Sequence, residues 1–556
     1  MSFVRDLPIL SIVVFLPLVG SILVAVAPRT ASRGIALGTA LATWVASLAL
    51  LAAFDPGGQE FQFGAQVEWI PLFGIQYKLG VDGLSLALVV LTTTLTWISI
   101  LASFRPIQER IKEYMISFLI LEVGMIGVFV ALDTFLFYIF WEIVLVPMYL
   151  IIGIWGGSNR IYATIKFVLY TLVGSLLMLV AILATAFAYQ AGHGGAWAGA
   201  FDFEKLRAFA GTGGFAAGLQ LFSFGAFFLA FAIKVPMFPF HTWLPDAHVE
   251  APTAGSVILA AIMLKLGAYG FIRFAIPLYP SAAHTFAPAI IALSLIGIIY
   301  GAIVALVQPD LKKLVAYSSV SHMGFVTLGL FVFNEQGVQG AILQMINHGL
   351  ITGALFLLVG VIYERAHDRT IAKMGGLAGS TPVYAAAFGF FAFASAGLPG
   401  LSGFVGEFLV LVGSFLYNPL VAAVASFVMI LSAAYLLWMF QRLMMGDLSD
   451  FLASIGHHLV DIRPIEILTL APLGALVVVF GLFPALLLDL VRGSVTSFVR
   501  TAAPAGPIAL PPLVPVVALA LVGLVIVARF VSVILDRAAT TDRRVAADTA
   551  HPADAR

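Results

Sequence analysis

Seven ionisable side chains stand inside long apolar runs of this sequence, where a membrane would surround them. They are Glu122, Glu142, Lys234, Lys265, His322, His348 and Glu407. A charge at the centre of a bilayer costs about 2.5–3.5 kcal/mol on insertion scales, and chains of such residues are the usual components of proton relays. Imidazoles exchange protons near neutral pH, and a buried amine holds its proton more or less tightly as a carboxylate approaches or retreats. The set therefore predicts a path for protons through a membrane.

Each member of this set has a plainer explanation when it is taken alone. A single buried histidine usually hydrogen-bonds to a neighbouring helix, and a Glu–Lys pair can hold two helices together. Seven groups at similar depth on different segments are harder to explain in this way. The pattern favours a relay over a passive scaffold of helices.

A second polar segment runs from His241 to Glu250 and contains two histidines, an aspartate and a glutamate. Their spacing does not match that of known zinc sites. We interpret the segment as a polar connection at the cytoplasmic mouth of the path. His241 and Glu122 are therefore secondary candidates for the relay, and no metal is expected.

The elements that hold these residues are predicted to be membrane-spanning helices. The chain has 556 residues, of which 61% are hydrophobic and 10% are charged, against about 25% charged in average globular proteins. Apolar runs of about 20 residues match the 30 Å hydrocarbon core. We predict an all-α integral membrane protein with about 15 spans. Their approximate limits are 8–27, 34–54, 84–104, 114–132, 134–155, 161–190, 219–243, 253–277, 284–307, 311–332, 337–363, 382–415, 419–445, 464–488 and 512–535.

Two of these spans are predicted to be broken. Pro236, Pro239 and Pro245 follow Lys234, and Gly397-Leu-Pro-Gly400 precedes Glu407. An interior proline removes a backbone hydrogen bond, and freed backbone at membrane depth is tolerated where it lines a cavity. The breaks lie five spans apart, which indicates two inverted five-helix repeats around a transport site.

This pattern divides the chain into five parts. The parts are a three-helix segment (1–113), a first repeat broken near Pro236 (114–277), an inverted second repeat broken near Pro399 (284–445), C-terminal helices (446–535) and a polar tail (536–556). Most Lys and Arg residues fall in alternate loops, starting with Arg29 and Arg33. Because positive loops stay inside, we expect the N-terminus outside and the C-terminus in the cytoplasm.

Composition also limits the chemistry of the chain. There is no cysteine, so thiolate-held iron–sulfur clusters and disulfides are excluded. The net charge is zero, which suggests no nucleic-acid partner. No nucleophile–base set points to a membrane enzyme that acts on lipid or peptide.

Several longer motifs resemble a known family. The strongest are Phe137-Tyr-Ile-Phe-Trp-Glu-Ile-Val-Leu-Val-Pro-Met-Tyr149, Trp243-Leu-Pro-Asp-Ala-His248, Ala251-Pro-Thr-Ala-Gly-Ser256, Tyr317-Ser-Ser-Val-Ser-His-Met-Gly324 and Gly403-Phe-Val-Gly-Glu407. From about Gly80 to Gly446 the chain resembles the antiporter-like membrane subunits of respiratory complex I, the proton-pumping NADH:quinone oxidoreductase. The glutamate at position 407 makes the chain similar to the M-type chains, the counterparts of mitochondrial subunit 4. The sister chains of the family typically have lysine at this position.

The resemblance implies a role for each matching residue. Glu142 and Lys234 would form a charge-modulating pair, and Lys265 would be the central relay group. His322 and His348 would continue the path, and Glu407 would be the terminal carrier near the outer side. Glu122 has no matching position. The family usually has fourteen helices, so 512–535 would be an extra one.

The resemblance also implies the setting of the chain. It would lie in the bacterial cytoplasmic (inner) membrane, among lipids and between antiporter-like neighbours of the membrane arm. NADH, FMN, iron–sulfur clusters and quinone would bind to partner subunits, and this chain would hold no cofactor. The alternatives are a subunit of a monovalent cation/proton antiporter or of a membrane hydrogenase, since the middle three motifs recur in those proteins.

Overall fold

The computed structural model describes residues 8–502 and 506–508, which form an α-helical bundle with one β-hairpin. Thirteen helices in these residues are long and apolar enough to cross a membrane. They are α2 (Ile9–Val26), α3 (Ser32–Ala53), α4 (Gly83–Ala102), α5 (Ile111–Val130), α6 (Thr134–Trp155), α7 (Arg160–Gly192), α9 (Ala217–Lys234), a composite span (Thr253–Leu278), α14 (Pro280–Leu306), α15 (Leu311–Phe331), α16 (Glu335–Ala366), α20 (Pro419–Met444) and α22 (Pro464–Leu482). The prediction of an all-α integral membrane fold is confirmed.

Both predicted breaks are present. The first falls between α9, which ends at Lys234, and α10 (Trp243–Glu250). The second separates α18 (Pro382–Ser395) from α19 (Ser402–Tyr417). The grouping into two inverted five-helix repeats stays a prediction. The predicted span 512–535 and the tail 536–556 lie outside the described residues.

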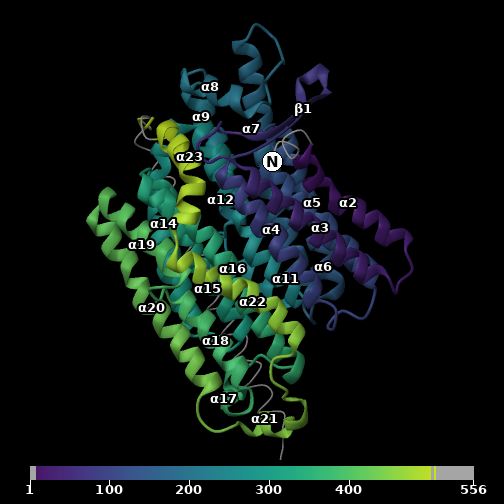
Figure 1. Ribbon diagram of the computed structural model, residues 1–556. Coiled ribbons are helices and arrows are strands. Elements are labelled where there is room, and N and C mark those ends of the chain that lie inside the picture. The colour runs from purple at the N-terminus through teal and green to yellow at the C-terminus, as the bar shows by residue number, and fades with distance from the viewer. Residues whose placement is uncertain (1–7, 503–505, 509–556) are drawn as a thin grey trace, which may run out of the picture. The chain divides into compact units, whose positions relative to one another are not determined.

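Two long connections between the spans contain regular structure. Residues 55–83 hold β1 (Gln62–Ile70) and β2 (Ile75–Val81), paired antiparallel. Residues 191–218 hold α8 (Phe203–Gly211), whose Asp202 side chain accepts hydrogen bonds from two backbone N–H groups of its first turn. These elements lie at one end of the bundle, which we call the hairpin end (Figure 1, top). The opposite end carries α17 (Leu377–Ser380) and α21 (Asp450–Ser454).

The end of the predicted span 464–488 was wrong. Helix α22 stops at Leu482, and α23 (Ala485–Ala502) follows as a separate helix. It buries Leu487, Val491, Val495 and Phe498 and exposes Arg492. An amphipathic helix of this kind lies along a surface rather than through a membrane.

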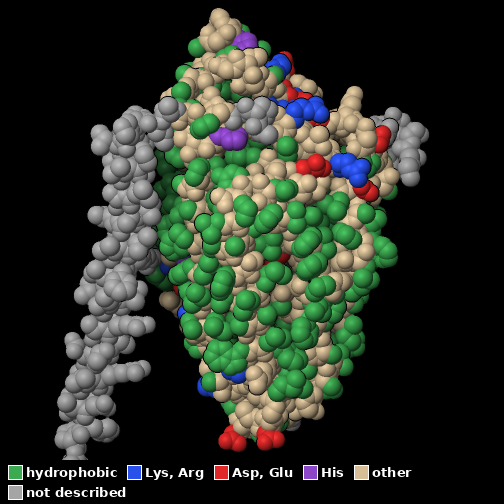
Figure 2. All heavy atoms as spheres, turned by 90° about the vertical axis from the view of Figure 1, so that its left-hand side faces the viewer, with side chains coloured by type: hydrophobic (Ala, Val, Ile, Leu, Met, Phe, Trp, Pro, Cys, Tyr) green, Lys and Arg blue, Asp and Glu red, His purple; other side chains and the backbone are tan. Residues whose placement is uncertain are grey.

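The middle of the molecule is covered by apolar side chains. Figure 2 shows hydrophobic groups across this band, with charged groups at its two ends. Such a large apolar surface marks contact with lipid or with partner chains. Inside it, α4, α15, α16 and the composite span are almost wholly buried. These central helices carry three of the predicted relay residues, Lys265, His322 and His348.

The composite span is irregular along its length. Two π-helical stretches, η2 (Leu259–Met263) and η3 (Phe271–Ala275), interrupt α11 (Thr253–Ile258), α12 (Leu264–Gly270) and α13 (Ile276–Leu278). π-Helical turns are rare and are found mostly at functional sites. Lys265 therefore sits in a short α-helical piece between two such turns.

Candidate ion-relay site

Lys234 is the last residue of α9, at the edge of the first break. It is 2% exposed, and its ammonium nitrogen lies 5.4 Å from the ring centre of Trp141 and 5.7 Å from that of Phe167. Within the described chain Lys234 forms no ion pair. Aromatic faces stabilise a desolvated ammonium by up to about 2 kcal/mol, so the cation is held without a bound carboxylate.

Glu142 lies on α6 beside Trp141 and is only half-buried. One of its carboxylate oxygens is buried and has no hydrogen-bond partner in the described part of the protein, while the Tyr138 hydroxyl hydrogen-bonds to the side chain. Glu142 is near enough to interact electrostatically with Lys234. The predicted pair is thus present as neighbours that do not touch.

Lys265 is completely buried in the composite span. Its ammonium donates to the Ala260 carbonyl at 2.7 Å and lies 2.6 Å from Nδ1 of His348. Ala260 lies within the π-helical stretch η2. The π turn therefore provides one of the two polar contacts of the central lysine.

The helices of Lys234 and Lys265 touch through their backbones. A Cβ atom on Gly267 would lie 2.8 Å from the Phe231 carbonyl oxygen and 3.0 Å from Cβ of Lys234. Only glycine permits this approach, since real Cβ atoms do not come within 3.0 Å of another heavy atom. The segments that carry Lys234 and Lys265 are therefore in direct contact.

The second break holds a cluster of directly bonded groups. Nδ1 of His322 lies 2.8 Å from the Glu407 carboxylate, to which the Gln344 amide also donates at 3.1 Å. Nε2 of His322 lies 3.3 Å from the Ser395 hydroxyl and 3.4 Å from that of Tyr435. The imidazole of His322 and the carboxylate of Glu407 are therefore contacted by side chains from five helices, α15, α16, α18, α19 and α20.

The two histidines face each other across a small cavity. Their ring centres are 5.8 Å apart, and the cavity of about 10 Å³ is lined by both rings, Glu407 and Ser395. This is about the space that one water molecule needs. When Lys265 donates to Nδ1 of His348, the proton of that ring sits on Nε2. Nε2 has no hydrogen-bond partner in the described residues, so it is free to donate onward.

A backbone carbonyl at the second break accepts a hydrogen bond from a side chain of α16. The Ser402 carbonyl, at the start of α19, accepts a 2.7 Å hydrogen bond from the Asn347 side chain. Asn347 precedes His348 on α16. The break is thus tied to the helix that carries the second histidine.

The two secondary candidates lie apart from this cluster. Glu122 is fully buried on α5, and neither of its carboxylate oxygens has a hydrogen-bond partner in the part described. His241 lies between α9 and α10 and stacks among aromatic rings, with the Tyr300 ring centre 5.1 Å away. Among residues 8–502 and 506–508, no group of three or more His, Cys, Asp or Glu side chains has a metal-binding arrangement.

Sequence reasoning missed several polar members of the site: Gln344, Asn347, Ser395 and Tyr435. Each is uncharged and lies in an apolar run. The charge criterion therefore passed over them, although polar side chains in a predicted span were the available signal.

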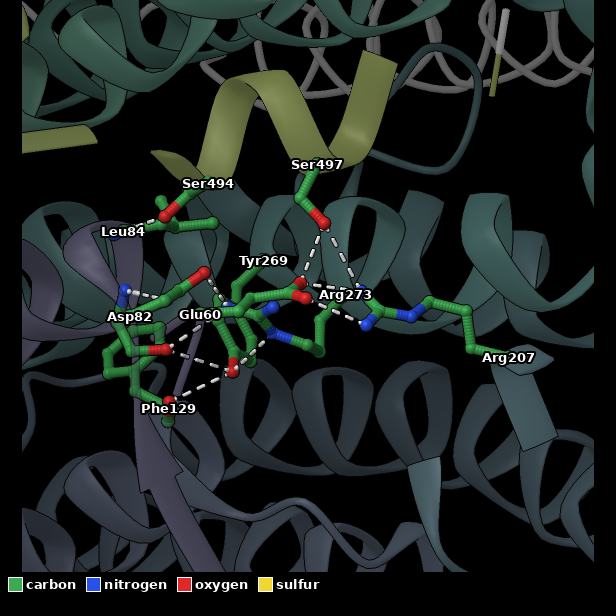
Figure 3. A network of polar contacts seen from close by, with 10 residues as sticks. Glu60, Asp82, Leu84, Phe129, Arg207, Tyr269, Arg273, Ser494 and Ser497 are labelled. Carbon is green, nitrogen blue, oxygen red and sulfur yellow. Dashed lines mark hydrogen bonds and ion pairs between the residues drawn. The ribbon is translucent and has the colours of Figure 1, made fainter. Parts of the chain in front are cut away.

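A second buried network closes the hairpin end of the composite span (Figure 3). Arg273, in η3, forms an ion pair with Asp82 at 2.5 Å and donates to the Tyr269 hydroxyl at 3.1 Å. Tyr269 in turn donates to the Phe129 carbonyl at 2.9 Å. Asp82 caps α4 by accepting a hydrogen bond from Ser85 N–H. These contacts anchor the composite span to α4 and α5.

The same view includes a surface part of the network. Arg207 binds Glu60 through two nitrogens at 2.5 and 2.8 Å, and Ser497 of α23 donates to Glu60 at 2.7 Å. Burial would raise the pKa of Glu60, but Arg207 and Ser497 outweigh it and hold that pKa below its usual value. The hairpin, α8 and α23 are thus joined at one carboxylate.

A membrane bundle with two broken helices and a row of buried Glu, Lys and His groups between them is the architecture of a cation-translocating membrane protein. Residues 131–458 match the family model described as NADH:quinone oxidoreductase/Mrp antiporter, TM. The chain belongs to this family of membrane subunits.

Named relatives narrow the comparison within the family. The chain is 49% identical over 509 residues to NADH-quinone oxidoreductase subunit M of Rhodobacter capsulatus, an alignment that covers 88% of this chain and 96% of the relative. It is 45% identical over 496 residues to NADH-ubiquinone oxidoreductase chain 4 of Marchantia polymorpha, with 88% and 97% of the two chains covered.

Solved structures agree with this fold. A chain of respiratory complex I from Thermus thermophilus has a TM-score of 0.79 and 32% identity, covering 89% of this chain and 99% of its own. A chain of the Mrp complex from Dietzia has a TM-score of 0.76 at 21% identity, covering 90% and 100%. The second likeness shows the fold alone.

Proposed function

We propose that this chain is the M-type subunit in the membrane arm of a proton-pumping NADH:quinone oxidoreductase, and that it carries protons through its buried relay. One observation carries the proposal. Lys265, His348, His322 and Glu407 form a nearly continuous series of contacts between the centre of the bundle and the second break. The similarity to subunit M and chain 4 supports membership in such a complex.

The relay would work in one direction. A proton would enter from the cytoplasm, reach Lys265, pass His348 and His322, and leave on the outer side through Glu407. This assumes the predicted orientation, with the N-terminus outside. Moving one charge against 100 mV takes about 2.3 kcal/mol, which is comparable to the change in proton affinity that one neighbouring charge produces.

The driving signal would act on Glu142 and Lys234. Because these groups are neighbours without an ion pair, a small movement would change their attraction strongly. Glu142 is half-buried at the bundle surface, where an adjoining membrane-arm subunit can reach it. The backbone contact at Gly267 would then pass the displacement of Lys234 to Lys265.

The redox chemistry would belong to other subunits. NADH, FMN, iron–sulfur clusters and quinone would bind there, and this chain, which contains no cysteine, would receive only a conformational or electrostatic signal. We place the chain in the bacterial cytoplasmic membrane, between antiporter-like neighbours on both sides. It is thus a subunit of an enzyme whose own part is translocation.

The test is the variant Lys234→Ala in the intact complex, reconstituted in proteoliposomes. NADH-driven quinone reduction and proton uptake are recorded together, with Lys205→Ala, an exposed lysine of α8, as the matched control. We expect proton uptake to fall about tenfold or more, about 1.4 kcal/mol in the barrier, with the control unchanged. Normal rates of both reactions in an assembled complex would make Lys234 a structural cation.

The second candidate function is that of a subunit of a monovalent cation/proton antiporter. Its support is the similar fold of a chain of the Mrp complex. Sodium-driven proton movement by the purified chain, together with its absence from any quinone reductase of the host, would favour that function. The acidic Glu407 and the M-type motifs favour the first.

A further inference from the structure

A large apolar groove lies between helices of the bundle. It has a volume of about 720 Å³ and is lined by α3, α4, α16, α22 and α23. Its α3 wall runs from Leu37 to Leu51, about 21 Å at the helical rise of 1.5 Å per residue. The indole N–H of Trp44 donates to the Thr94 hydroxyl at 3.0 Å, so these two lining residues satisfy each other. This apolar groove is long, narrow and suited to hydrocarbon chains.

A polar pocket adjoins the groove at the hairpin end. Its volume is about 440 Å³, and it is lined by the loop from Phe54 to Glu60 and by the polar side of α23. Leu490 lines both hollows, and Leu51 of the groove is three residues from Phe54 of the pocket. The apolar groove and the polar pocket therefore form one amphipathic hollow where α3 and α22 end.

The walls of the polar pocket are held in place by the network of Figure 3. Ser494 of α23 accepts a hydrogen bond from Leu84 N–H at 3.1 Å, and Ser497 binds Glu60. Two of the acids that line the pocket are already neutralised, since Glu60 pairs with Arg207 and Asp82 with Arg273. The pocket is thus formed before any ligand arrives.

Two cations of α23 remain at the mouth of this pocket. Arg500 is exposed and forms no ion pair within residues 8–502 and 506–508. Arg492 contacts Asp489 in a pair that is more than half exposed on both sides, so a competing anion can displace it. Guanidinium groups bind phosphate through paired hydrogen bonds. A third acid of the lining, Asp55, accepts a hydrogen bond from Gly57 N–H and forms no ion pair in the described residues. The two guanidinium groups outnumber it, so the polar end offers a phosphate group two cationic partners.

We propose that this hollow binds one membrane phospholipid, with its acyl chains in the apolar groove and its phosphate beside Arg492 and Arg500. The occupant is chosen by the shape of the site. A phospholipid carries hydrocarbon of roughly this length directly below an anionic phosphate, and the hollow offers those two environments in the same order. The bound phospholipid would connect α22 and α23 to α4, close to the Arg273–Asp82 ion pair that holds the composite span.

The experiment uses the intact complex and two variants that attack the two halves of the site. Arg492→Gln with Arg500→Gln removes the cations, and Ala475→Phe fills the groove from its exposed position on α22. Ala423→Phe, also exposed but on α20, adds the same ring to another apolar surface as the control. Phospholipid retained after stepwise detergent washing is counted by native mass spectrometry and phosphorus assay.

We expect both site variants to lose about one phospholipid per complex and the control to lose none. Unchanged retention in both variants would overturn the proposal. A groove that retains an isoprenoid quinone, or no lipid at all because a neighbouring helix covers it, would overturn it as well. As a measurement without variants, a photoactivatable phospholipid should label peptides of α22 and α23 in the wild-type complex, and absence of that label would count against the site.

Discussion

The two broken helices of this protein hold their charged groups in different ways. At the first break Lys234 lies among aromatic rings, with Glu142 nearby but not bound. At the second break Glu407 is bound by His322 and Gln344. The charged group of the first break therefore has no ion-pair partner in the described residues, whereas that of the second break is fixed by hydrogen bonds. In the proposed function, the first break would be the input site and the second break the output site.

Removing the carboxylate of the second break should have the largest effect. Glu407→Gln leaves a neutral amide that cannot take up and release a proton, although its carbonyl oxygen can still accept the hydrogen bond from Gln344. We expect proton uptake per NADH oxidised to fall at least about tenfold. Glu335→Gln, an exposed acid of α16, is the control. Pumping at the wild-type ratio would sink the assignment of Glu407 as the exit group.

The first break should respond more weakly to loss of its carboxylate. Glu142→Gln removes an attraction that acts at a distance, so the complex should assemble normally while pumping slows about five- to tenfold, about 1–1.4 kcal/mol in the barrier. Proton uptake and quinone reduction measured together check this, against Glu68→Gln on the exposed face of β1. An effect as large as that of Glu407→Gln would remove the distinction between input and output.

The contact between α9, which carries Lys234, and the composite span, which carries Lys265, is tested at Gly267. In Gly267→Ala the added methyl meets the Phe231 carbonyl at 2.8 Å, which must push α9 and the composite span apart at a cost of about 1–3 kcal/mol. We expect a lower melting temperature and a reduced ratio of protons pumped to NADH oxidised. Gly225→Ala on α9, where a Cβ meets nothing within 4 Å, should be silent. A normal ratio in Gly267→Ala would mean that the signal does not pass through this contact.

The smallest effect concerns pH at the hairpin end. Because the folded-state pKa of Glu60 is lowered, its stabilising contribution is present above the ordinary carboxyl pKa of about 4.3 and is lost as the pH falls through the lowered value. Wild type should therefore melt a few degrees above Glu60→Gln at pH 7, and the gap should close as the pH falls below about 4. A gap of constant size from pH 7 to pH 3 would contradict the ionised Glu60–Arg207 contact.

Sequence reasoning was most reliable where the type of a single residue and its immediate neighbours in the chain were enough to predict a feature. Lys234, Lys265 and Glu407 were found because a charge within an apolar run has few explanations. Both breaks followed from local proline and glycine patterns. The hairpin, α8 and α23 were missed because short amphipathic elements at a membrane surface have no strong apolar run.

The membrane class, nearly all of the spans in the described residues, both broken helices and the ionisable residues inside the spans could be predicted from the sequence. These features depend on hydropathy and on local backbone chemistry. The sequence could not predict that Lys265 bonds to His348, that His322 bonds to Glu407, or that Lys234 and Glu142 form no ion pair. The two bonded pairs are 83 and 85 positions apart in the chain, and helix packing, not sequence spacing, sets which side chains meet.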